Sequence, residues 1–224
     1  PPTGRDTRRR LGRLDGTPDA HPDDVTPLPI SVTRSAELSQ AALLPEDLHG
    51  RGDLFPEGRL DQDLQQVDLR DRNSWRLTLA EVSSVELLET QLVNAVAPFV
   101  LNARLKPLML RARGRDQHIV NVSAVEGQFY RRFKTTRHPH TNMAKAAVNM
   151  LTRTSAREMF ETDGILMTSV DTGWITDERP HPTKVRLAEE GFHAPLDLVD
   201  GAARVYDPIV RGEAGEDVFG VFLK

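Results

Sequence analysis

A basic loop is the first segment of the sequence whose residue types point to chemistry. Residues 130–140 (YRRFKTTRHPH) hold Arg131, Arg132, Lys134 and Arg137, which makes this the densest positive stretch of the chain. Guanidinium groups bind carboxylates and phosphates through pairs of parallel hydrogen bonds. One interpretation is therefore a clamp for an anionic small molecule that carries a phosphate or a carboxylate.

Two other interpretations of this loop are open. Phe129, Tyr130 and Phe133 alternate with the basic residues, a pattern that also suits single-stranded nucleic acid. The formal net charge of −4 gives no whole-chain support for a nucleic-acid partner, so we favour this interpretation less. The third interpretation is a solvated basic surface whose charges pair with Asp and Glu elsewhere.

Several kinds of site are excluded or disfavoured by composition. The chain of 224 residues has no cysteine, which excludes disulfide scaffolds, cysteine nucleophiles, iron–sulfur clusters and thiolate zinc sites. His138 and His140 are separated only by Pro139 and have no obvious third ligand nearby, so we predict no metal site.

The elements that must position these residues become regular after residue 75. Ser83 and Glu86 have the spacing of a capping box, which predicts that a helix begins there and continues to about residue 113. Pro98 lies inside this helix and is expected to kink it or to free a carbonyl group.

Short β-branched runs alternate with helical patterns in the rest of the chain. We predict strands at 118–123, 165–170 and 218–223, helices at about 139–162 and 196–210, and a turn and loop with Pro180 and Pro182. This order predicts an α/β fold, a Rossmann-like three-layer parallel sheet with helices on both faces. Ligands of such sheets bind beyond the carboxyl ends of the strands, here at 123–141 and 171–178.

Residues 1–74 differ in composition from the rest of the chain. They hold eight of the 15 prolines, and Phe55 is their only aromatic residue. Such a segment buries little apolar surface. We therefore expect a loop-rich, partly disordered segment over 1–74 and a Rossmann-like domain over 75–224.

Four segments of 75–224 resemble the C-terminal half of the short-chain dehydrogenase/reductase (SDR) family. In chain order they are QLVNAVAP with Asn94, IVNVSAVEG with Ser123, AKAAVNMLTRTSA with Lys145, and GILMTSVDTGWIT with Thr176. The resemblance implies an oxidoreductase that uses NAD or NADP and moves a hydride to or from a small carbonyl or alcohol substrate. It also implies a homo-oligomer formed through the helices that carry Asn94 and Lys145.

The resemblance further implies a role for each residue that matches a family motif. Lys145 would bind the ribose and lower the pKa of a proton-donating phenol, because a nearby cation favours the phenolate. Asn94 would hold a water of the proton relay, and Ser123 would polarise the substrate carbonyl. The resemblance places the nicotinamide against Gly173, Ile175 and Thr176.

Two catalytic positions depart from the family pattern. The family serine aligns with Ala124, and Ser123 beside it points to the other face unless the strand end twists. The family tyrosine lies one helical turn before the lysine, at Thr141, whose hydroxyl is a poor proton donor. Tyr130, if its loop folds back, and His140, of a residue type that titrates near neutrality, are the candidate donors. The alternative is a catalytically degenerate SDR-like binding or regulatory protein whose basic loop holds an anionic ligand.

The family's glycine-rich turn for the cofactor pyrophosphate is not recognisable. Gly4, Gly12 and Gly16 lie among Arg and Asp residues without a preceding apolar strand. We therefore expect a fragment or a divergent member that begins after the N-terminal dinucleotide-binding strands. No apolar run approaches the roughly 18 residues of a membrane span, and no signal peptide is recognisable. We expect a soluble, cytoplasmic protein without a membrane partner.

Overall fold

The computed structural model describes residues 52–61, 64–111 and 117–224. The chain divides into two compact units, Pro1–His49 and Gly50–Lys224, and the description below concerns the second unit. Most of the segment 1–74, which we expected to be loop-rich, lies outside the described residues. In its described part, Leu60 and Gln66 form an isolated antiparallel bridge.

The first long helix is continuous but changes its winding near Pro98. Ser84–Gln91 (α3) and Ala97–Met109 (α4) are joined by a π-helical turn, Leu92–Val96. The Ala97 N–H bonds to the carbonyl of Leu92, five residues back. Pro98 was expected to kink the helix or to free a carbonyl group, because it has no N–H to donate. In the structure the helix instead widens into a π-helical turn directly before Pro98.

Both ends of this helix can be compared with the prediction. The Ser83 hydroxyl accepts a hydrogen bond of 3.1 Å from the Glu86 N–H, so Ser83 caps α3 as predicted. The helix ends at Met109, a few residues earlier than expected.

The sheet is parallel and has the strand order β1-β2-β3. Its strands are His118–Ser123 (β1), Leu166–Asp171 (β2) and Phe222–Leu223 (β3). The first two strands are confirmed to within one residue, whereas β3 is shorter than the predicted 218–223. Ser123 lies opposite Asp171 in the register, so β1 and β2 end side by side.

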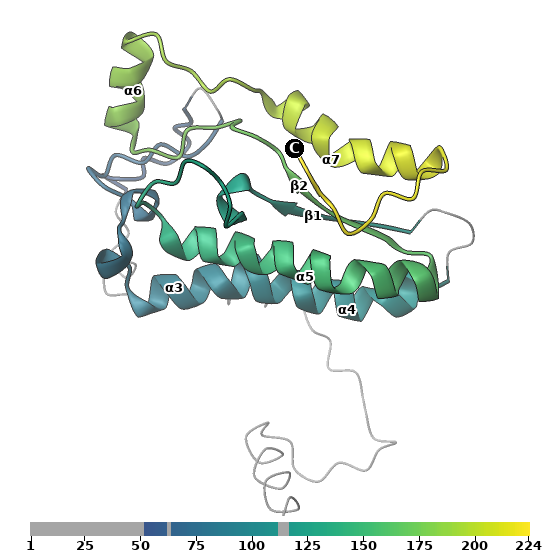
Figure 1. Ribbon diagram of the computed structural model, residues 1–224. Coiled ribbons are helices and arrows are strands. Elements are labelled where there is room, and N and C mark those ends of the chain that lie inside the picture. The colour runs from purple at the N-terminus through teal and green to yellow at the C-terminus, as the bar shows by residue number, and fades with distance from the viewer. Residues whose placement is uncertain (1–51, 62–63, 112–116) are drawn as a thin grey trace, which may run out of the picture. The chain divides into compact units, whose positions relative to one another are not determined.

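Helices cover both faces of this sheet. Pro139–Asp163 (α5) connects β1 to β2, and Leu198–Glu213 (α7) connects β2 to β3. In Figure 1, α3, α4 and α5 lie on one side of the strands and α7 on the other. This arrangement confirms the α/β, Rossmann-like fold class. The predicted helix at about 139–162 is confirmed: α5 begins at Pro139, and Gly164 follows its last residue with the left-handed φ of 72° that favours glycine.

One helix contradicts the prediction. His181–Glu189 forms a helix (α6) where a turn and loop were expected from Pro180 and Pro182. Pro182 lies in the first turn of α6, where a residue needs no N–H for the helix ladder. The two prolines therefore mark the start of a helix here, and the loop prediction was wrong.

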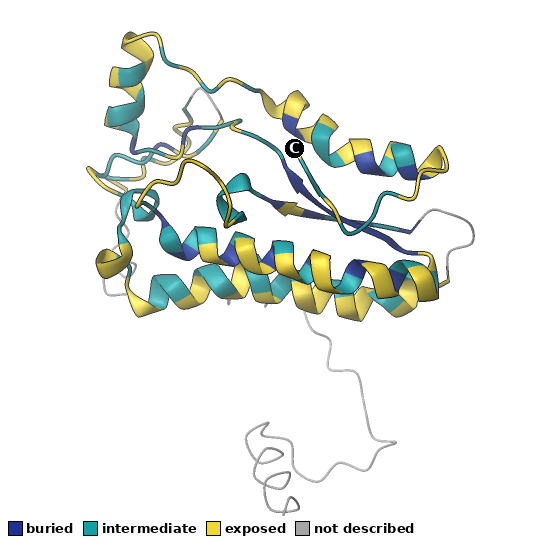
Figure 2. Cartoon of the chain, viewed as in Figure 1, coloured by how far each residue is buried: buried dark blue, intermediate teal, exposed yellow. Residues whose placement is uncertain are grey.

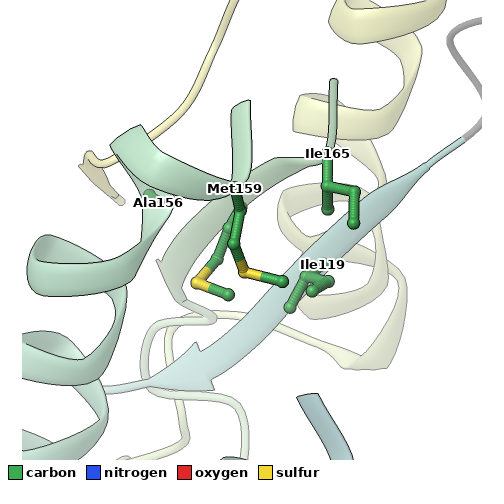
Figure 3. Packing of buried hydrophobic residues seen from close by; sticks show 5 residues of the cluster. Ile119, Ala156, Met159 and Ile165 are labelled. Atoms are coloured by element: carbon green, nitrogen blue, oxygen red, sulfur yellow. The ribbon is translucent and has the colours of Figure 1, made fainter. Parts of the chain in front are cut away.

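The core lies between the sheet and one face of α5 (Figure 2). The buried residues of α5 recur every three or four positions, and every residue of β2 is buried. Figure 3 shows Ala156 and Met159 of α5 against Ile119 and Ile165. No helix in the described ranges has the length and apolar content needed to cross a membrane.

Candidate functional site

Lys145 lies on α5 against the carboxyl end of β1. Its ammonium nitrogen donates a hydrogen bond of 3.2 Å to the main-chain oxygen of Val122. The hydroxyl of Ser123 donates one of 3.3 Å to the main-chain oxygen of Lys145. The structure thus brings Ser123 and Lys145 together and ties the strand end to the helix at this point.

The electrostatics of Lys145 are those of a half-buried cation. Burial lowers the pKa of Lys145, because an ammonium loses hydration when it leaves water. An ammonium has three N–H donors, and its one side-chain hydrogen bond to the described residues is the bond to Val122. Two donors remain for hydroxyl or carbonyl oxygens of a ligand.

Ser123 faces α5. Its residue is 4% exposed and its hydroxyl proton is engaged with the helix backbone. Gly127 follows in a 3-10 turn, Val125–Gly127, and a Cβ atom there would lie 2.6 Å from the carbonyl carbon of Lys145. The chain after β1 therefore passes directly over the backbone of Lys145, and only glycine fits at this crossing.

Asn94 lies in the π-helical turn that packs against α5. Its side-chain amide donates a hydrogen bond of 3.3 Å to the carbonyl of Thr90 in the preceding helical turn. The side-chain amide of Gln91, at the end of α3, donates a hydrogen bond of 2.8 Å to the carbonyl of His140 at the start of α5. The amide of Asn94 is thus engaged with its own helix.

Tyr130 is in solvent. Its residue is 95% exposed, and its ring meets that of Phe129 edge-on at 5.5 Å. The loop does not fold back to bring this phenol to the half-buried Lys145.

His140 belongs to the buried face of α5. Its residue is 4% exposed, and its Nε2 lies 3.4 Å from a carboxylate oxygen of Glu86 on α3. Five residues separate it from Lys145, which is a rotation of about 140° around a helix. His140 therefore faces α3, whereas Thr141 shares the face of Lys145 one turn earlier.

Most cationic side chains of the basic loop bind other groups of the same chain. Arg131 pairs with the carboxylate of Glu126, and Lys134 donates to the main-chain oxygen of Glu126. Arg137 donates to the main-chain oxygen of Arg76 at 2.6 Å. Burial lowers the pKa of Lys134. These contacts leave Arg132 as the loop cation without a hydrogen bond or ion pair to the described residues.

The turn after β2 brings Gly173, Ile175 and Thr176 to the same sheet edge. Gly173 has a φ of 80°, and its N–H donates to the carboxylate of Asp171 at 3.0 Å. Ile175 packs on Gly201 of α7, where an added Cβ atom would lie 2.1 Å from Ile175 Cδ1. Beside Ile175 and Thr176 lies a cavity of about 520 Å³ with apolar walls from Leu196, Leu198 and Val199. We call this the apolar cavity.

Two further residues hold this turn, Asp171 and Arg204. Asp171 is buried and accepts the Gly173 N–H, and Arg204 of α7 donates to the main-chain oxygen of Asp171 at 3.4 Å. The signal for Asp171 was present, since an Asp two residues before Gly suits an Asx turn. Arg204 carried no comparable signal. Across the described ranges, no group of three or more His, Cys, Asp or Glu residues is arranged to hold a metal ion.

Comparison with known proteins supports the fold. No model of a protein family matches the chain. "Uncharacterized protein R665" of Acanthamoeba polyphaga mimivirus is 31% identical over 149 residues, which are 64% of this chain and 31% of that protein. The chain therefore spans less than a third of the length of that relative.

Two solved structures are similar at the level of the backbone. "Carbonyl reductase Sniffer of D. melanogaster" has a TM-score of 0.51 and 23% identity, over 65% of this chain and 57% of that chain. "Dehalogenation enzyme" has a TM-score of 0.52 and 18% identity, over 70% of this chain and 64% of that chain. At these identities the likeness shows the fold alone, and it is the Rossmann-like fold described above.

Proposed function

We propose that this chain carries the catalytic lysine and the nicotinamide-contacting turn of an SDR-type, NAD(P)-dependent oxidoreductase. The observation that carries the proposal is the position of the half-buried Lys145 ammonium at the end of β1. Because β1 and β2 end side by side, the Gly173–Thr176 turn lies at the same sheet edge. The substrate class is a small carbonyl compound or the corresponding alcohol.

The residues at this edge fit the nicotinamide and its ribose. Lys145 has two N–H donors for ribose hydroxyls, and the apolar cavity beside Ile175 and Thr176 suits a flat ring. Lys145 would hold the ribose, and Gly173, Ile175 and Thr176 would contact the nicotinamide of NAD or NADP. When bound, the nicotinamide supplies the acceptor or donor of the hydride.

We assign proton exchange to Lys145 itself. Carbonyl reduction consumes one hydride and one proton, and the reverse oxidation releases both. The exposure of Tyr130 and the contact of His140 with Glu86 keep both groups away from the lysine. Burial lowers the pKa of Lys145, which makes its ammonium a stronger acid than that of an exposed lysine. Ser123 acts as a positioning residue through its bond to the Lys145 backbone, and Asn94 is proposed to hold a water nearby.

Activity assays with Lys145 variants test this proposal. The wild type should oxidise NADH or NADPH with a member of a panel of aldehydes and ketones. Lys145→Met should lower kcat by about 10²- to 10⁴-fold, the usual contribution of a general acid. Lys145→Arg keeps the charge but not the titration, so residual activity should lose its pH dependence. Full activity of Lys145→Met, or a loss of similar size in Tyr130→Phe or His140→Ala, would overturn the assignment.

The alternative function is a catalytically degenerate binding or regulatory protein. It is favoured by Ala124 and Thr141 at the two family catalytic positions and by the engaged hydroxyl of Ser123. In this case a nicotinamide cofactor binds without turnover of any member of the panel. Its anionic ligand would depend on Arg132, so Arg132→Ala should weaken binding of an anionic probe such as inorganic phosphate.

We also propose that the chain forms a homo-oligomer through α3, α4 and α5. Large apolar residues on these helices are exposed, among them Leu88, Phe99, Leu105 and Met150. An extended apolar surface of this kind marks an interaction site. Sedimentation should give a mass above that of one chain, and Phe99→Glu with Met150→Glu should return it to the monomer mass. A monomeric wild type would contradict the proposal.

A further inference from the structure

The apolar cavity has more room than a nicotinamide ring needs. Its volume is about 520 Å³, and cavities of about 300–1,000 Å³ hold whole drug-sized ligands, which are much larger than this ring. The proposed nicotinamide contacts, Ile175 and Thr176, form only one part of its wall. The rest of the wall comes from Leu64 and from residues 193–199. A bound nicotinamide would therefore leave space in the cavity for a substrate.

The rest of the wall is mainly apolar and accessible. Leu64, Leu198 and Val199 line the cavity, and these residues are 70%, 60% and 75% exposed. Single exposed apolar side chains are common on protein surfaces and need no explanation. Three of them around one cavity form an apolar surface that a ligand can cover.

The charged and polar members of this wall are engaged within the chain. The carboxylate of Asp197 caps α7 and accepts hydrogen bonds from the N–H groups of Val199 and Asp200, at 2.8 and 2.9 Å. His193 Nδ1 lies 2.9 Å from the main-chain oxygen of Ala194. Among the described residues that line the cavity there is no Lys or Arg. An anionic ligand would find no cation in this wall, and the Asp197 carboxylate would repel it.

Leu64 has an unusual backbone conformation for its residue type. Its φ is 60°, in the left-handed region that glycine and asparagine adopt most readily. A leucine gains nothing for the turn itself in this region, and its side chain stays largely exposed at the cavity. Local backbone preference and burial in the core therefore do not account for a leucine here.

The turn that carries Leu64 is held from outside. The main-chain oxygen of Asp61 accepts a hydrogen bond of 3.1 Å from the Leu64 N–H, and the Asp61 carboxylate accepts one of 3.0 Å from the Gln65 N–H. Lys184 of α6 pairs with the same carboxylate, and both of these side chains are at most 10% exposed. Unfavourable backbone conformations that the surrounding structure imposes occur most often at ligand sites.

We infer that the apolar cavity receives an uncharged, apolar group of the carbonyl substrate, and that Leu64 is a specificity-determining residue for that group. The inference rests on the proposed oxidoreductase function. It narrows the substrate class to ketones and aldehydes that carry an alkyl or aryl substituent, together with the corresponding alcohols.

A matched pair of ketones tests the substrate class. In 6-oxoheptanoate a carboxylate replaces the terminal methyl group of 2-heptanone. Calorimetry and ligand-observed NMR on the full chain, with and without reduced nicotinamide mononucleotide, should show that 2-heptanone binds at least about tenfold more tightly than 6-oxoheptanoate. From 2-pentanone to 2-heptanone, each methylene should tighten binding by about fourfold, as expected for a buried CH₂ group. Absence of 2-heptanone binding, or equal or tighter binding of 6-oxoheptanoate, would overturn the inference.

A substitution of Leu64 separates its role in binding from a role in the fold. Asparagine suits the left-handed turn, so Leu64→Asn should unfold at the same temperature as the wild type or a higher one. The same variant should weaken 2-heptanone binding by about tenfold or more, the effect of losing contact with about two CH₂ groups. Unchanged 2-heptanone binding in Leu64→Asn would contradict the role of Leu64.

Two further variants complete this test. Val199→Thr keeps the shape of the side chain but adds a hydroxyl to the cavity wall, and it should also weaken 2-heptanone binding. Leu79→Asn makes the Leu64 substitution at a leucine that is 81% exposed and outside the cavity lining, so it should leave binding unchanged. Equal effects of Leu64→Asn and Leu79→Asn would show that the cavity is not the site of binding.

The titration with reduced nicotinamide mononucleotide keeps this inference apart from the proposed function. If the mononucleotide binds through Lys145 but 2-heptanone is insensitive to Leu64→Asn, the inference fails and the oxidoreductase proposal stands. If 2-heptanone binds through Leu64 but the mononucleotide does not bind, the cofactor assignment fails. The apolar preference of the cavity is then confirmed without the reaction.

Discussion

The hydroxyl of Ser123 donates a hydrogen bond of 3.3 Å to the main-chain oxygen of Lys145. This bond fixes the last residue of β1 on the helix that carries the lysine. It also directs the serine proton to the protein backbone. The structure therefore favours a positioning role for Ser123 over direct contact with a substrate carbonyl.

Removal of this hydroxyl should have a modest effect. Ser123→Ala should lower the free energy of unfolding by about 0.5–1.5 kcal/mol, the usual net contribution of one hydrogen bond to stability. Urea unfolding measures the change. The activity of Ser123→Ala should fall much less than that of Lys145→Met, and an equal fall would show that the serine contacts the substrate.

The buried charge of Lys145 should lower the free energy of unfolding at neutral pH. Its pKa is lowered in the folded state, so the unfolded state binds more protons between the folded pKa and the ordinary value near 10.4. The stability of the wild type should then rise with pH through this window. Lys145→Met removes the penalty and should stabilise the protein at pH 7.

Comparing the stability of wild type and Lys145→Met at two pH values tests whether the difference changes with pH in this direction. Urea unfolding near neutral pH and again near pH 10 should show the gain of the variant shrinking at the higher pH. Other titrating groups are common to both proteins and cancel in the difference. A difference that stays constant with pH would mean that burial does not penalise the Lys145 ammonium.

Gly127 should tolerate no side chain. The Cβ atom of Gly127→Ala would lie 2.6 Å from the carbonyl carbon of Lys145 and 2.8 Å from the nitrogen of Ala146. Overpacking of this kind costs about 1–3 kcal/mol. Gly52→Ala is the matched control, because a Cβ there meets nothing within 4 Å. Equal unfolding midpoints for the two variants would rule out the close crossing.

A buried chain of hydrogen bonds crosses the core under the site. Asn102 donates to Asn121 at 3.0 Å, and Asn121 donates to Thr152 at 3.0 Å. Ser169 donates to the same Thr152 hydroxyl at 2.7 Å. Thr152→Val leaves both donors unpaired and should cost about 1–3 kcal/mol, whereas Thr152→Ser keeps the oxygen. If both variants unfold at the same urea concentration, the hydroxyl does not hold this chain together.

His138 should make the fold sensitive to acid. Burial lowers the pKa of His138, so the folded state favours the neutral ring, which stacks on Trp75. The unfolded state binds the proton first as the pH falls below about 6.5, and stability is lost from there downward. His138→Asn suits the left-handed φ of 41° and removes this titration.

Thermal unfolding between neutral and mildly acidic pH follows this effect. The variant should be less stable at neutral pH, because it loses the stacking contact, but should lose less stability on acidification. Parallel pH profiles for wild type and His138→Asn would assign the acid sensitivity to another group.

Sequence patterns predicted the elements whose ends carry a local signal. Pro139 and Gly164 mark the two ends of α5, and the β-branched run at 118–123 is β1. Ser123 and Lys145 were named from the resemblance to the SDR family, and α5, which begins near the end of β1, carries the lysine to that strand end. Helix α6 was missed because Pro182 breaks a helix interior and starts a helix equally well.

Contacts that depend on loop conformation or on distant segments could not be predicted. The exposure of Tyr130 depends on the path of a loop that has no periodicity. The hydrogen bond from Gln65 to Glu178 joins residues 113 positions apart in the chain. No local spacing encodes such a meeting, and only the packed structure shows it.

The most direct test of the central proposal is a calorimetric titration of this chain with NADH, NADPH and reduced nicotinamide mononucleotide. The mononucleotide carries only the ring, ribose and one phosphate, the part that Lys145 and the Gly173–Thr176 turn are proposed to hold. The proposal predicts that it binds the wild type and that Lys145→Met weakens this binding by about tenfold or more. No binding of any of the three, or equal binding by Lys145→Met, would contradict the nicotinamide site.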